Sequence, residues 1–190
     1  FEPPVGGTRF GGAPDLEAEI SWPEHDGRPL EFLAQVALGD VEGLDVDGVL
    51  PDRGLLSFFV DASFTDARSS DYLANSRVLH CADVSVLVRA EVPAGVAPHP
   101  VCTVDFYALL QLARYADKVH APPPEGHQLL GYRDRVSQKS PPLASRLLFQ
   151  CITDPTTGTH WGEAVHLDYW MDREMLSKRE FDRAVTRYGD

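Results

Sequence analysis

Cysteine, methionine and long apolar runs are all scarce in this 190-residue sequence. The three cysteines, Cys81, Cys102 and Cys151, include no C-x-x-C pair. Each lies in an apolar stretch, where a cysteine usually behaves as a small hydrophobic residue. That usage predicts a protein of the reducing cytoplasm. No apolar run approaches the roughly 18 residues that a membrane-spanning helix needs, so we expect no membrane segment.

Basic residues are few and scattered. The sequence has 17 Lys and Arg against 29 Asp and Glu, a formal net charge of −12. Proteins that bind nucleic acid or anionic membranes concentrate Lys and Arg on one surface, and no such cluster is present here. We therefore expect neither nucleic acid nor a membrane as a partner. The acidic surface would attract a basic partner protein, or it serves solubility alone.

Catalytic and phosphate-binding motifs are absent as well. The sequence contains no G-x-S-x-G, no P-loop lysine and no G-x-G-x-x-G. Its seven histidines have no H-E-x-x-H spacing, so we expect no metal and no cofactor. His160, Glu163, His166 and Asp168 are close enough in sequence to bind a divalent ion, but a polar surface explains them equally well.

Turn-forming residues, in contrast, are plentiful. Fifteen prolines and 15 glycines are dispersed between apolar runs, which is typical of many short strands joined by turns. Hydrophobic residues make up 43% of the chain. A chain of this length buries about 70% of its unfolded surface, enough for one large domain. We therefore expect residues 1–190 to form a single domain.

Two stretches of the sequence look like copies of one another. Residues 55–61 and 166–172 each end in an aromatic pair, one apolar residue and an aspartate. Each is preceded by an apolar strand with one glutamine, at residues 32–36 and 147–151. Residues two apart share a face of a strand. In residues 55–61 and in residues 166–172, the side chains therefore alternate between an apolar face and a mixed face. This alternation predicts an antiparallel sheet.

The repeat predicts the fold class. We expect an α+β protein that is mainly antiparallel β, with an internal duplication of a β-hairpin module in pseudo-repeated halves at about 28–61 and 144–172. Gln35 and Gln150 occupy the same position in the two halves. A buried amide without a partner costs roughly 1–3 kcal/mol, so we expect both to be hydrogen bonded, for example to a neighbouring loop.

Two segments have the apolar spacing of helices. Phe106, Leu109, Leu110 and Ala113 follow a possible capping residue at Thr103 or Asp105. Near the end of the chain, Ser-Lys-Arg-Glu at 177–180 has the pattern of a capping box, and an apolar stripe follows over 181–188. The second pattern predicts a short C-terminal helix docked on the sheet.

An ordered set of motifs resembles the YwqG-like family, bacterial proteins classed as a domain of unknown function. The set includes Thr-Arg-Phe-Gly-Gly-x-Pro at 8–14, the two glutamine strands, His-Gln-Leu-Leu-Gly-Tyr at 127–132, and Trp-Gly-Glu at 161–163, where the family has Asp at the third position. The resemblance implies a roll-like β architecture with a few short helices. It supplies no catalytic residues. Some relatives are encoded near secreted toxins, which suggests an immunity role.

We expect a ligand or partner site in a cleft between the two halves. Arg9, between two Gly-Gly pairs, can reach a carboxylate, although these glycines could equally serve close packing. Two carboxylates at a pseudo-twofold axis could do acid–base work or bind a cation, or simply cap turns. The candidate residues are Arg9, Asp61, His127, Gln128, Trp161, Glu163 and Asp172.

The sequence thus favours an uncharacterised cytoplasmic bacterial binding protein, an immunity-type protein that neutralises a basic toxin. The charge of −12 and the missing catalytic motifs support this hypothesis. The alternative is a small-ligand-binding protein or a hydrolase-like enzyme that uses carboxylates in the cleft. The two classes differ in one structural expectation: an enzyme needs Arg9, Asp61, His127 and Asp172 to converge on one pocket.

Overall fold

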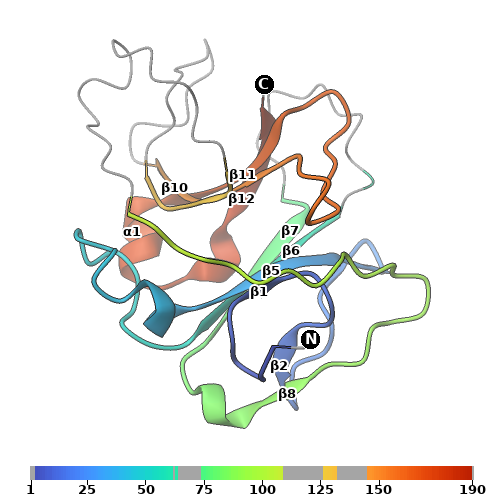
Figure 1. Cartoon of the computed structure of the whole chain (residues 1–190), viewed down its shortest axis with the longest axis horizontal. Helices are drawn as coiled ribbons and strands as arrows, with labels where there is room; N and C mark the ends of the chain where they lie inside the picture. Colours follow the sequence, from blue (N-terminus) through green and yellow to red (C-terminus); the bar gives the residue numbers. More distant parts are fainter. Residues whose placement is uncertain (1–2, 62, 64–73, 109–125, 132–144, 190) are drawn as a thin grey trace.

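Two four-stranded antiparallel sheets form the body of the molecule (Figure 1). The computed structural model describes residues 3–61, 63, 74–108, 126–131 and 145–189. The first sheet has the strand order β1 (Arg9–Phe10), β5 (Glu31–Ala37), β6 (Leu55–Val60), β7 (Ser76–Cys81). The second has the order β9 (Gln128–Leu129), β10 (Ser145–Ile152), β11 (His166–Asp172), β12 (Val185–Gly189).

Smaller elements surround these sheets. Two ribbons pair β2 (Asp15–Glu17) with β8 (Leu87–Arg89), and β3 (Glu24–His25) with β4 (Arg28–Pro29). The described helices are α1 (Arg173–Ser177) and the 3-10 turns η1 (Leu38–Val41), η3 (Val84–Val86) and η4 (Phe181–Arg183). The prediction of a mainly antiparallel β protein with a few short helices is therefore confirmed.

The core lies between the two sheets. The ring of Phe58 on β6 lies 4.5 Å from that of Phe149 on β10 and 5.3 Å from that of Tyr169 on β11. All three side chains are buried. Burying a side chain of this size contributes roughly 1.5–3 kcal/mol, so this contact is a main reason why the two sheets stay together.

The two sheets have the same pairing register. Gln35 lies opposite Ser57, and Gln150 lies opposite Asp168, in the alignment that places Asp61 on Asp172. The register shifts at the corresponding place in both, between residues 32 and 34 and between residues 147 and 149. Because a β-bulge redirects the side chains beyond it, a bulge at the same position keeps equivalent residues on equivalent faces.

The prediction of a C-terminal helix over 178–188 is wrong. Ser177 ends α1 instead of beginning a helix, and Arg179 takes a positive φ of 61°, which stops the helix. After η4 the chain forms β12, which pairs with the edge of β11. Thr186 and Tyr188 are both buried there. Pairing with an open sheet edge outweighs the local helical pattern, because it satisfies a whole row of backbone groups.

The predicted internal helix falls mostly outside the described residues, which stop at residue 108 in this region. The part that is described, residues 105–108, is irregular. Within the described ranges, no helix combines the length and apolar character needed to cross a membrane.

Candidate functional site

A cleft of about 370 Å³ lies between the two sheets, where the outer strands β1 and β9 approach one another. Binding pockets for small molecules have volumes of about 300–1,000 Å³. Both sheets contribute to its largely apolar wall, as do residues 104–108, which run between them (yellow-green in Figure 1). The apolar lining includes Phe10, Val36, Leu50, Phe106, Leu130 and Phe149.

The segment along the cleft is fixed to the first sheet by backbone hydrogen bonds. The N–H of Phe10 donates to the carbonyl of Cys102 (3.0 Å), and the N–H of Cys102 donates back (3.1 Å). Gly11 has a positive φ of 63°, and a Cβ there would lie 2.1 Å from the carbonyl oxygen of Pro100. Only glycine fits this approach. The Gly-Gly pair after Phe10 therefore serves close packing.

Acidic residues stand at the rim of the cleft. Asp45, Asp47 and Asp105 line it, together with one arginine, Arg146. Asp45 accepts a hydrogen bond from the N–H of Leu50 (2.7 Å), which fixes the loop, and Arg146 forms an ion pair with Asp47. Apolar walls with carboxylates at the rim suit a group that has an apolar body and a positive end.

His127 lies on the wall of the cleft. Its ring packs against Phe10 with centroids 4.2 Å apart. Nδ1 accepts a hydrogen bond from the N–H of Ile152 (3.2 Å), and Nε2 faces the Asp154 carboxylate at 3.4 Å. Burial lowers the pKa of His127, although Asp154 opposes this. The ring is therefore neutral near pH 7 and joins β9, β1 and β10 as a packing element.

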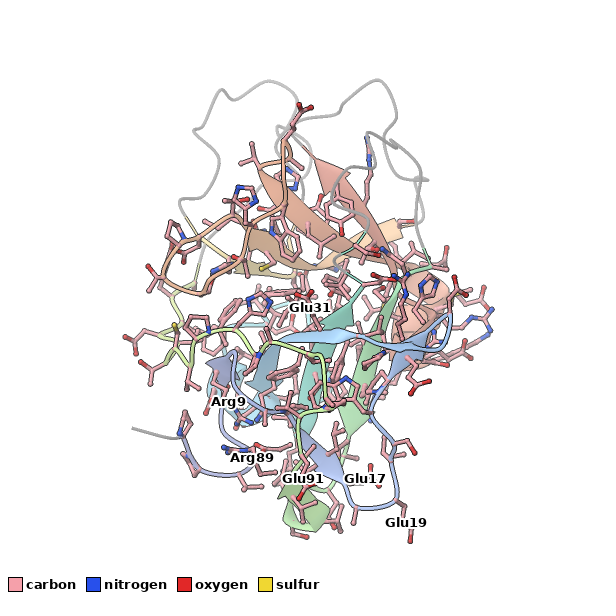
Figure 2. The ribbon with its side chains drawn as sticks, turned by 90° about the vertical axis from the view of Figure 1, so that its right-hand side faces the viewer. Arg9, Glu17, Glu19, Glu31, Arg89 and Glu91 are labelled. Carbon is pink, nitrogen blue, oxygen red and sulfur yellow. The ribbon has the colours of Figure 1, made fainter. Side chains whose placement is uncertain are left out.

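Arg9 does not line the cleft but forms a buried ion pair on the other side of its strand (Figure 2). Its guanidinium donates to Asp15 (2.9 Å) and to the carbonyl of Ala13, and Arg89 donates to the second carboxylate oxygen (2.6 Å). Burial alone would raise the pKa of Asp15, but these hydrogen bonds outweigh it and lower the pKa to about 2. Asp15 therefore joins Arg9 of β1 to Arg89 of β8.

The glutamine strands behave as predicted. Gln35 accepts a hydrogen bond from the N–H of Asp15 (2.9 Å) and donates to the carbonyl of Gly7 (2.7 Å) and to the Asp15 carboxylate (2.7 Å). Its side chain ties β5 to the N-terminal loop, which confirms the structural interpretation. Gln150 donates to Asp168 (2.8 Å), whose carboxylate is also 3.0 Å from Nδ1 of His166.

The aligned aspartates bind different groups. Asp61 accepts hydrogen bonds from Ser63 and lies 3.1 Å from His25 and 3.2 Å from Arg28. Burial would raise the pKa of Asp61, but the hydrogen bonds from Ser63 and His25 lower it. Asp172 instead caps α1 by accepting from the N–H of Glu174 (2.8 Å). Neither carboxylate lines the cleft.

Two further candidates belong to the second sheet. Trp161 is buried, donates from its indole nitrogen to the carbonyl of Cys151 (2.9 Å) and packs against Tyr188. Glu163 is exposed in the turn before β11. His160, nearby, accepts from the N–H of Gly162 (3.1 Å). Of the seven candidate residues, the structure brings only His127 and Gln128 together at the cleft.

Sequence reasoning missed the acidic rim. The loop over residues 39–54 is acidic and rich in glycine, and on its own this pattern indicates only a hairpin loop. Nothing in it predicts that Asp47 pairs with Arg146, because the two segments are about 100 positions apart. The acidic composition of the loop is visible in the sequence. The position of the loop beside the cleft is not.

Comparison with known proteins identifies the family. The profile of the domain of unknown function DUF1963 matches residues 8–189. No curated protein matches the chain. The finer YwqG-like name stays a prediction. The match spans both sheets and the segment along the cleft. The chain therefore belongs to the DUF1963 family.

Proposed function

We propose that the protein binds a basic partner protein at the cleft between the two sheets and is not an enzyme. One observation carries this proposal: an apolar cleft formed by both sheets has Asp45 and Asp105 at its rim, beside Asp47, which pairs with Arg146. A partner with lysine or arginine beside apolar side chains would match both features. Matching charges also speed association and exclude wrong partners.

The charge of the whole chain supports the same partner. A net charge of −12 produces a negative field that attracts basic proteins over distances of about a Debye length, roughly 8–10 Å at physiological salt. The proposed biological setting is toxin neutralisation in the bacterial cytoplasm. That setting rests on the family resemblance described above and on the three cysteines, which are free thiols in the structure.

A hydrolase-like enzyme receives less support from the described residues. Asp61 binds His25 and Arg28. Asp172 caps the start of α1, and Arg9 binds Asp15. Only His127 of this set lines the cleft, and burial favours its neutral form. A small-ligand-binding protein is the second candidate, because the volume of about 370 Å³ also suits a small molecule.

We also propose that the two sheets arose by duplication of one module. The common strand order and the bulge at the same position in β5 and β10 support this interpretation. The cleft needs residues from both sheets, so a single module would not form it.

Site-specific photo-crosslinking in the source cells tests the proposed binding surface. Tyr107 lines the cleft and is 73% exposed, so an aromatic crosslinker replaces it with little disturbance. Val88 on β8 is 49% exposed and does not line the cleft, which makes it the control position. We expect a basic protein to be captured from position 107 and not from position 88. Equal capture from both positions, or capture from 88 alone, would contradict the proposal.

A further inference from the structure

The outer edge of the first sheet is already occupied by an extended segment of the chain. Phe10 on β1 lies opposite Ala34 of β5, and its N–H and carbonyl point away from β5 to pair with Cys102. The next residue, Gly11, donates inward to the carbonyl of Leu33 (2.8 Å). This is the normal alternation of an antiparallel edge strand, in which neighbouring residues bond on opposite sides.

The second sheet repeats this alternation at β9. Leu129 lies opposite Phe149 of β10, as Phe10 lies opposite Ala34. The next residue, Leu130, donates inward to the carbonyl of Leu148 (2.9 Å), as Gly11 does to Leu33. The N–H and carbonyl of Leu129 therefore point away from β10.

We propose that an extended segment of the partner protein pairs with Leu129 at this edge, as Cys102 pairs with Phe10 in the first sheet. In the part of the chain that the structure describes, no backbone group pairs with the outward N–H and carbonyl of Leu129. Such an edge is a template for strand addition, in which backbone hydrogen bonds supply affinity and alternate side chains supply specificity.

The chemistry beside this edge defines the segment. Leu129 itself lines the cleft, so a strand paired with it places every second side chain toward the cleft. Apolar side chains there meet the walls formed by Phe10 and Phe149, and a basic side chain meets the carboxylates at the rim. The occupant is therefore an extended peptide whose cleft-facing positions, which are every second residue, combine apolar side chains with one lysine or arginine.

This inference rests on the proposed function, since it describes how the partner occupies the same cleft. The two can fail separately. Binding through side chains alone would leave the cleft as the binding site, with no strand added at β9.

Nuclear magnetic resonance with defined peptides tests the inference on the unmodified protein. The probe is acetyl-Val-Thr-Val-Thr-Lys-amide, in which Val, Val and Lys share one face, added at millimolar concentration to the 15N-labelled full chain. One control peptide has Glu in place of Lys, and another has the Lys sequence with its backbone amides N-methylated. We expect the Lys peptide to shift the Leu129 amide signal and to slow its hydrogen exchange about tenfold. Both control peptides should bind at least tenfold more weakly.

The other outcomes overturn the inference. Shifts confined to Phe10, Phe106 and Phe149, with exchange at Leu129 unchanged, would mean that side chains enter the cleft without strand addition. Equal binding of the N-methylated peptide would mean the same. No shift with any peptide would also overturn it, and the crosslinking at position 107 would then decide the proposed function independently.

Discussion

The hydroxyl of Tyr169 in the second sheet donates a 3.1 Å hydrogen bond to the carbonyl of Phe59 in the first. Both residues are completely buried, and the Tyr169 ring also packs against Phe58. Burial raises the pKa of Tyr169 well above its usual value, so the hydroxyl keeps its proton and remains a donor. This contact joins the two sheets that form the cleft.

Removing that hydroxyl should loosen the junction of the sheets. For Tyr169→Phe we expect the free energy of unfolding to fall by about 0.5–1.5 kcal/mol, because one buried hydrogen bond is lost while the ring is kept. Urea denaturation followed by tryptophan fluorescence measures the change. Tyr107→Phe, at a side chain that is 73% exposed, is the matched control and should change stability by less than about 0.5 kcal/mol.

Asp15 should make stability depend on acid pH. Its pKa in the folded state, about 2, lies below the ordinary value of 3.8, so its ionised form stabilises the fold above about pH 4. That contribution, about 2 kcal/mol, is lost as the pH falls from 4 to 2. Urea denaturation at several pH values should show Asp15→Asn much less stable than the wild type at pH 6, with the difference shrinking below pH 4.

Asp182→Asn is the control for this experiment, because Asp182 is exposed in η4 and its removal changes the net charge equally. A constant difference between wild type and Asp15→Asn from pH 6 to pH 2 would show that the carboxylate charge is not what the Arg9 network stabilises.

Gly11 should be harder to replace than Gly43. Gly11→Ala places a Cβ 2.1 Å from the carbonyl of Pro100, in a left-handed backbone, so we expect a loss of about 2–4 kcal/mol. Gly43→Ala has a similarly positive φ of 80° but no atom within 4 Å of the new Cβ, and should lose only about 1–2 kcal/mol. Thermal unfolding compares the two variants. Equal losses would mean that the chain at Pro100 moves aside freely.

The cysteines should react in a fixed order. Burial raises the pKa of Cys151 strongly and that of Cys81 to about 11, so neither forms much thiolate at pH 8. Cys102 is half-buried beside the cleft. With iodoacetamide and mass spectrometry, we expect modification at Cys102 first and at Cys151 only after unfolding. Early modification of Cys151 would contradict the burial of β10.

The antiparallel strands were readable from the sequence because a strand with one buried face shows local alternation. Gln35 and Gln150 occupy equivalent positions and are hydrogen bonded, as their apolar surroundings required. Asp61 and Asp172 are also equivalent in register, yet one binds His25 and the other caps α1. A shared position in a strand does not fix what lies beyond its end, because the following segments differ.

Other features depend on contacts between distant segments. The last strand, β12, forms because the edge of β11 is open to it, and the residues 177–188 alone contain only a helical pattern. The acidic rim likewise requires the loop of Asp45 to lie beside β10. Such long-range pairings cannot be read from local periodicity.

The most direct measurement for the whole account is the affinity for the crosslinked partner, determined by isothermal titration calorimetry with two charge variants. Asp105→Lys at the rim of the cleft and Asp182→Lys in η4 change the net charge equally, and both residues are exposed. We predict that Asp105→Lys weakens binding at least tenfold, about 1.4 kcal/mol, while Asp182→Lys weakens it less than about threefold. Equal weakening by the two variants would contradict the assignment of the cleft as the binding site.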